Sequence, residues 1–184
     1  MDTNESFSVT STIGNTSQEN LKNVKSIEIL PTNGDANGSK FSGTYTIKVV
    51  SLAEGQKLYY TTKSISVIGL TEDKYGKLTI KEVDLANDDR WTEAKVGDTI
   101  PSSSTALATQ IDTILPYENV NYTMEITPTN NKQGDIYAFT MNVTSDNLAQ
   151  AVKSNTVISK VVERTIEGFG FIDVNRNNIY DTGD

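Results

Sequence analysis

Apolar and polar residues alternate along most of the chain, which is the pattern of β-strands with one buried face. The alternation is clearest at residues 136–145, where Tyr137, Phe139, Met141 and Val143 occupy every second position. The same pattern, rich in threonine, valine, isoleucine and tyrosine, predicts further strands at residues 7–13, 24–30, 41–50, 57–62 with an extension at 65–68, 78–83, 121–127 and 157–166. Short strands separated by turns are typical of an antiparallel β-sandwich, so we expect an all-β, antiparallel fold of this kind.

Residues 105–115 fit two patterns. Leu107, Ile111 and Ile114 have the spacing of a helix, and the serines at positions 102–104 would cap its start. The flanking segments alternate with the period of a strand, so we favour a strand here. Two Asn-Gly pairs within residues 31–39 predict tight turns after the second strand.

Composition narrows the possible chemistry. The chain has 184 residues, enough for one domain, or for one domain and a fragment of another. Its net charge of −8 argues against nucleic acid and anionic membranes as partners, and favours solubility and cation binding. The sequence contains no cysteine and no histidine, which excludes disulfides, thiolate chemistry, histidine-based catalytic triads and nearly all catalytic zinc sites. Catalysis by carboxylates alone is still open, but we expect no enzyme.

The last twelve residues carry the most specific motif. Side chains with short oxygen-bearing groups stand at positions 1, 3, 5, 9 and 12 of a loop, and position 7 would supply a backbone carbonyl. These positions are Asp173, Asn175, Asn177, Asp181 and Asp184, with Ile179 at position 7. Alternate side chains of a tight loop turn toward one centre, and Ca²⁺ takes six to eight oxygens at about 2.3–2.6 Å. The spacing therefore predicts an EF-hand-like calcium site.

Two positions depart from the usual loop. Asn178 stands where glycine is usual, although asparagine tolerates the left-handed conformation better than most residues. Asp184 replaces the usual glutamate, and its shorter side chain favours binding through one oxygen. The alternative is a surface turn whose asparagine and aspartate side chains cap their own backbone.

The motif also suggests a domain boundary. Residues 168–173 have the pattern of a new strand leading into the loop, so we expect one domain at residues 1–167 and the start of another at 168–184. No run approaches the ~20 apolar residues of a membrane span, and the amino terminus lacks the features of a signal peptide. Because the chain stops within a motif, we expect it to be a piece of a larger protein.

Three motifs stand out along the first part of the chain: Ile-Leu-Pro-Thr-Asn-Gly-Asp at residues 29–35, Ser-Lys-Phe-Ser-Gly-Thr-Tyr at 39–45 and Leu-Tyr-Tyr-Thr-Thr at 58–62. Together with segments at 15–17, 21–24, 106–115 and 134–136 and with Trp91, they resemble a recurring immunoglobulin-like module of large Gram-positive surface proteins, which implies an immunoglobulin-like β-sandwich. Residues 168–184 resemble the opening of the B-type repeats of serine-aspartate-repeat and collagen adhesins, which begin with a short strand and a calcium loop.

The resemblance implies a structural or adhesion module at the bacterial cell surface, secreted and anchored to the cell wall through a region outside this chain. Calcium would then stiffen the joint between tandem domains, because a metal held between modules orders a linker that otherwise flexes. The implied partners are neighbouring domains of the same protein and a host or cell-surface protein or glycan.

Other chemistries have weaker signals. Asp84, Asp88, Asp89 and Glu93 surround Trp91, an arrangement that also suits a carbohydrate-binding module stacking a sugar on Trp91 or on Tyr59. The simpler interpretation is a solvated acidic loop with one tryptophan in the core.

An intramolecular isopeptide bond is a further possibility. Lys22, Lys25, Lys48 and Asn155 are of the right residue types, although no spacing singles them out. A dockerin-like module carries the same calcium loop but duplicates it, and this chain has one copy.

Overall fold

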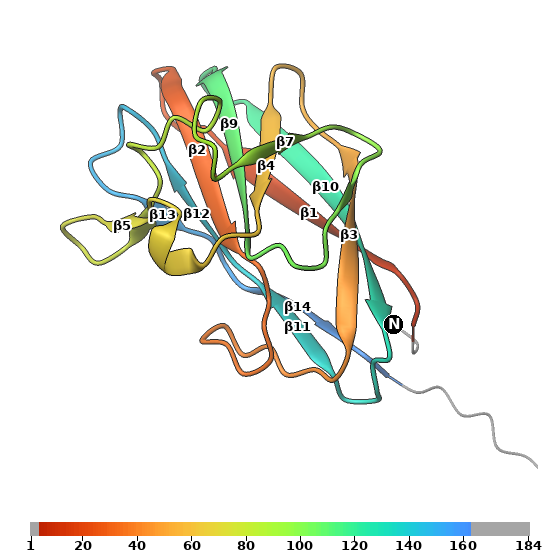
Figure 1. The fold of residues 1–184 in the computed structure, drawn as a ribbon. Helices are drawn as coiled ribbons and strands as arrows, with labels where there is room; N and C mark the ends of the chain where they lie inside the picture. The colour runs from red at the N-terminus through yellow and green to blue at the C-terminus, as the bar shows by residue number, and fades with distance from the viewer. Residues whose placement is uncertain (1–3, 163–184) are drawn as a thin grey trace, which may run out of the picture.

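The computed structural model describes residues 4–162, which form an antiparallel β-sandwich with no α-helix in that range (Figure 1). One sheet has the order β1-β10-β3-β8 and the other β13-β12-β2-β9-β4-β7. The first sheet comprises β1 (Phe7–Gly14), β10 (Asn119–Thr129), β3 (Thr44–Ser51) and β8 (Thr99–Ile100). The second comprises β13 (Val152–Lys153), β12 (Met141–Thr144), β2 (Leu21–Ile29), β9 (Ala106–Ile114), β4 (Lys57–Thr61) and β7 (Thr92–Ala94).

Two small strand pairs and one 3₁₀ turn complete the described part of the chain. Strand β11 (Ile136–Phe139) pairs with β14 (Val157–Lys160), and β5 (Thr71–Glu72) pairs with β6 (Leu78–Thr79). A single 3₁₀ turn, η1, spans Ile65–Val67. No helix in residues 4–162 is long and apolar enough to cross a membrane. The all-β class and the antiparallel sandwich expected from the alternation are confirmed.

Most predicted strands are present. Within residues 105–115, Ala106–Ile114 form strand β9 rather than a helix. The segment at 136–145 is broken at Thr140, because β11 pairs with β14 whereas β12 joins β2 in the large sheet. The Thr140 hydroxyl instead lies 2.9 Å from that of Thr156. The strand expected at 157–166 ends at Lys160 within the described residues.

Two predicted strands are wrong in whole or in part, and both lie in the segment that covers the second sheet. Residues 65–68 form a 3₁₀ turn, and residues 78–83 are a strand only at Leu78–Thr79. The side chains of Ile68, Ile80 and Val83 are buried by packing onto the sheet from outside, so these segments need no partner strand. Ile68 and Ile80 are each at most 1 % exposed there.

The sandwich therefore has two apolar cores. The main one lies between the sheets and combines side chains of β1, β10 and β3 with those of β2, β9 and β12. The second lies on the outer face of the large sheet, where residues 65–91 cover it; its buried members are Ile27, Tyr59, Ile68, Ile80, Val83, Leu85, Trp91, Ala106 and Ala108. Strand β2 is consequently buried on both faces from Val24 to Glu28.

The loop between β2 and β3 contains the predicted Asn-Gly turns. Gly34 and Gly38 have φ angles of +82° and +93°, which favour glycine. Between them, the Asp35 carboxylate accepts hydrogen bonds from the backbone N–H groups of Thr32, Asn37 and Ser39 at 3.0–3.1 Å. Burial opposes ionisation, but these hydrogen bonds, led by that from Ser39, hold the pKa of Asp35 below its usual value.

Replacing Asp35 with alanine is expected to lower the free energy of unfolding by about 2 kcal/mol, because three backbone donors lose a charged acceptor. Chemical denaturation of the two proteins measures the difference. Asp112→Ala is the matched control, since Asp112 is exposed on β9, and it should change stability by less than about 0.5 kcal/mol. Equal losses in both variants would contradict the role assigned to Asp35.

Candidate functional site

The predicted calcium ligands Asp173, Asn175, Asn177, Ile179, Asp181 and Asp184 lie outside the described residues. The domain boundary near Glu167 lies outside them as well. Both stay predictions. Among residues 4–162 the acidic loop after β6 is the part of the sequence-predicted chemistry that forms a pocket.

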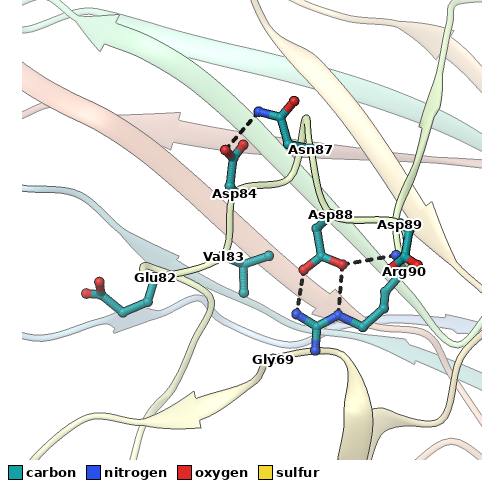
Figure 2. A pocket seen from close by; sticks show the side chains of 8 residues that line it. All are labelled: Gly69, Glu82, Val83, Asp84, Asn87, Asp88, Asp89 and Arg90. Atoms are coloured by element: carbon teal, nitrogen blue, oxygen red, sulfur yellow. Dashed lines mark hydrogen bonds and ion pairs between the residues drawn. The ribbon is translucent and has the colours of Figure 1, made fainter.

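Figure 2 shows this pocket, an open hollow of about 630 Å³ beside the loop that precedes β7. Eight residues line it: Gly69, Glu82, Val83, Asp84, Asn87, Asp88, Asp89 and Arg90. The dashed contacts in Figure 2 join Asp88 to Arg90 and Asp84 to Asn87.

Arg90 and Asp88 form a two-point ion pair. The Arg90 Nε donates to Asp88 Oδ1 at 2.8 Å, and its Nη2 donates to Asp88 Oδ2. Nη1 donates to the Val67 carbonyl oxygen at 2.6 Å, which ties the loop to the 3₁₀ turn. The hydrogen bonds from Arg90 hold the pKa of Asp88 below its usual value. This pair therefore fastens the outer cover of the large sheet.

Lys25, on strand β2 of the large sheet, also holds this loop in place. Its Nζ donates to the carbonyl oxygens of Lys81 and Val83, at 2.9 and 2.7 Å. Burial lowers the pKa of Lys25, and the nearby carboxylates of Asp84, Asp146 and Glu82 oppose that shift. Lys25 thus has its amine directed to two backbone acceptors of the loop.

Two of the four carboxylates that line the pocket are engaged by neighbouring side chains of the loop. Asp88 is held by Arg90, and Asp84 accepts a hydrogen bond from Asn87 at 2.9 Å. In residues 4–162 no group of three or more acidic residues is arranged to hold a metal ion. The contacts of this loop are those of a structural cover.

The aromatic residues considered for sugar stacking are in the second core. Trp91 is 6 % exposed, and its Nε1 donates to the Ile68 carbonyl oxygen at 3.4 Å. Tyr59 is 2 % exposed. Neither ring offers an open face to a sugar, which agrees with the simpler interpretation of a tryptophan in the core.

The residue types considered for an isopeptide bond are not brought together. Lys22, Lys48 and Asn155 are exposed. Lys25 is buried, but its amine is bonded to the outer cover, whereas Asn155 borders a cavity between the sheets. Unlinked side chains are therefore what the described geometry favours.

The sequence did not reveal a buried carboxyl group between the sheets. Glu28 is 2 % exposed, and the Tyr122 hydroxyl donates to its Oε2 at 3.1 Å. Burial raises the pKa of Glu28 to about 7, and the hydrogen bond from Tyr122 opposes the shift. In sequence, Glu28 looks like an outward position of an alternating strand; that both faces of β2 are buried is visible only in the fold.

Comparisons with known proteins add little to this geometry. No family model matches the sequence, and no curated protein matches it. Two solved structures are similar to it at low level. One is a family 123 glycoside hydrolase from Clostridium perfringens, with a TM-score of 0.34 and 12 % identity over 88 % of this chain. The chain spans 22 % of that hydrolase. The other is AvmM, which catalyses macrocyclization in alchivemycin A biosynthesis, with a TM-score of 0.34 and 8 % identity over 90 % of this chain and 85 % of AvmM.

Proposed function

We propose that this protein is a non-enzymatic structural or adhesion module of a Gram-positive cell-surface protein. In this proposal the sandwich spaces or presents binding domains, and a calcium ion in residues 173–184 stiffens the joint to the next domain. The observation that supports it most is the spacing of Asp173, Asn175, Asn177, Asp181 and Asp184, which follows a β-sandwich closely in the chain.

The fold is compatible with a spacer. A sandwich with two apolar cores resists deformation, because close-packed interiors have low compressibility. Its loops are tied down by polar contacts, such as those of Asp35 and Arg90. In the pocket of the acidic loop, Asp88 is paired with Arg90 and Asp84 accepts a hydrogen bond from Asn87.

Calcium would act on the joint through linkage. A ligand that binds only the ordered linker stabilises the ordered state. Once the ion concentration exceeds the dissociation constant, this stabilisation grows with the logarithm of the ion concentration. Extracellular calcium modules bind at about 10⁻⁴–10⁻³ M. The proposed location is therefore the bacterial cell surface, with anchoring through another region of the protein. The proposed partners are neighbouring domains and a host or cell-surface protein or glycan.

Thermal unfolding with and without calcium tests this proposal. The whole chain and a version ending at Glu167 are compared in millimolar calcium and in chelator. We expect calcium to raise the midpoint for the whole chain and to leave the shorter version unchanged, because the ligands follow Glu167. A whole chain that does not respond, or an equal response of both versions, would contradict the proposal.

A further inference from the structure

The two sheets leave a gap at one edge of the sandwich. Strand β1 is the outer strand of its sheet and, among the described residues, pairs only with β10. Strands β13 and β14 form the facing edge, paired with β12 and β11. Two cavities of about 220 and 320 Å³ lie in this gap, and both are lined by Thr12, Met141 and Ser154. They therefore form one groove alongside β1.

The two halves of the groove differ chemically. The larger cavity is mainly apolar, and its lining includes Ile13, Leu21, Val143, Leu148 and Val152. The smaller one is lined by Glu28 and by hydroxyl-bearing and amide side chains, among them Ser11, Thr140, Ser154 and Asn155. A ligand that fills the groove would place an apolar group in one half and a polar group in the other.

The free edge of β1 lacks the features that usually block pairing. Exposed edge strands are commonly protected by charged residues, proline or bulges. Residues 6–18 contain no charged residue and no proline, although 22 % of the chain is charged. The register of β1 with β10 runs from Phe7 to Gly14 without a shift. This edge can therefore pair with an added strand.

Glu28 gives the groove a preference for a positively charged group of the ligand. It is buried at the polar half of the groove, and no cationic side chain of the described residues contributes to its pKa. An isolated buried carboxyl group is costly to ionise, and an entering ammonium or guanidinium group offsets that cost. The groove is thus complementary to a basic side chain beside Glu28 and an apolar one beside Ile13.

We propose that this groove binds one extended polypeptide strand of a partner protein, which pairs with the backbone of β1. Alternate side chains of the strand point into the groove, an apolar residue in the larger cavity and a lysine or arginine two or four residues away facing Glu28. A second folded copy of this chain fits less well, because its own apolar side chains already fill its core. The inference extends the proposed function by assigning an adhesive surface, and it does not depend on calcium.

The test measures binding of a labelled ten-residue peptide to the whole chain by fluorescence anisotropy. The peptide carries one lysine, one leucine and one valine at alternate positions and threonine at the other seven, and a matched peptide carries glutamate in place of lysine. We expect saturable binding of the lysine peptide, at least tenfold tighter than that of the glutamate peptide. Glu28→Gln should remove most of this difference, and Val152→Glu, at an exposed position of the larger cavity, should weaken both peptides.

Equal affinity for the two peptides, or no effect of Val152→Glu, would overturn the proposal. Self-association of the chain that Val152→Glu abolishes would also overturn it, because a second copy would then be the occupant. The thermal midpoints of both variants establish that they are folded. The same binding in calcium and in chelator separates this result from the calcium test of the proposed function.

Discussion

Replacing Glu28 with glutamine is expected to stabilise the protein by about 3 kcal/mol at pH 8 and to change little at pH 4. The carboxyl group has a pKa of about 7 in the folded protein, against an ordinary value of 4.5. The folded state therefore favours the protonated form. The stability that this form contributes is complete below pH 4.5 and is lost as the pH rises through about 7. Glutamine is neutral at every pH and avoids this loss.

Urea unfolding of the two proteins between pH 4 and pH 8 measures the effect. The pKa values of Asp35, Asp73, Asp84 and Asp88 are lowered, so their contribution to stability falls with decreasing pH. That contribution is the same in both proteins and cancels in the difference. Glu125→Gln, at a half-buried position of β10, is the control for the exchange of glutamate for glutamine itself. Parallel profiles for wild type and Glu28→Gln would contradict the burial of an unpaired carboxyl group.

Replacing Trp91 with alanine is expected to cost about 3–5 kcal/mol, the largest single effect in the outer core. The indole is buried among the side chains of the cover and of the large sheet, including Ile68 and Tyr59. Removing it leaves a cavity and also leaves the Ile68 carbonyl without its hydrogen bond from Nε1. A loss of this size is a large fraction of the total, since domain stabilities are about 5–15 kcal/mol.

Denaturant unfolding again gives the measurement, with Tyr75→Ala as control. Tyr75 is 57 % exposed at the tip of the cover, so its loss should cost less than about 0.5 kcal/mol. If both substitutions had the same small effect, residues 65–91 would not form a second core. If Trp91→Ala unfolded residues 65–91 while the two sheets stayed folded, denaturation would show two transitions. The cover would then be an independently unfolding unit.

The alternation of residues predicted strands β1, β10 and β3 well, because one face of each meets the main core and the other faces solvent. It failed where this condition fails. Residues 65–68 and 78–83 alternate, but they bury their apolar side chains against the outside of the sheet without strand pairing. In β2 the cover buries Ile27 on the outer face, so the neighbouring Glu28 has the pattern of a solvent-facing position although it lies between the sheets.

The chemistry of a candidate site could be predicted from the sequence only where a motif has a specific residue spacing. The calcium loop is predicted from a pattern of oxygen-bearing residues within one short segment, and it stays a prediction because residues 173–184 lie outside the described residues. The groove beside β1 needs residues from β1, β2, β12 and the segment around Ser154, which the chain brings together only by folding. The partners of Lys25 are likewise backbone carbonyls more than fifty residues away, and no sequence pattern indicates them.

Direct calcium titration by calorimetry tests the central proposal most closely. The whole chain is compared with Asp173→Ala and with Asp35→Ala, which removes an aspartate outside the predicted loop. We expect one site with a dissociation constant of about 10⁻⁴–10⁻³ M in the whole chain and in Asp35→Ala, and none in Asp173→Ala. A whole chain that binds no calcium, or binds it equally well after Asp173→Ala, would contradict the calcium joint.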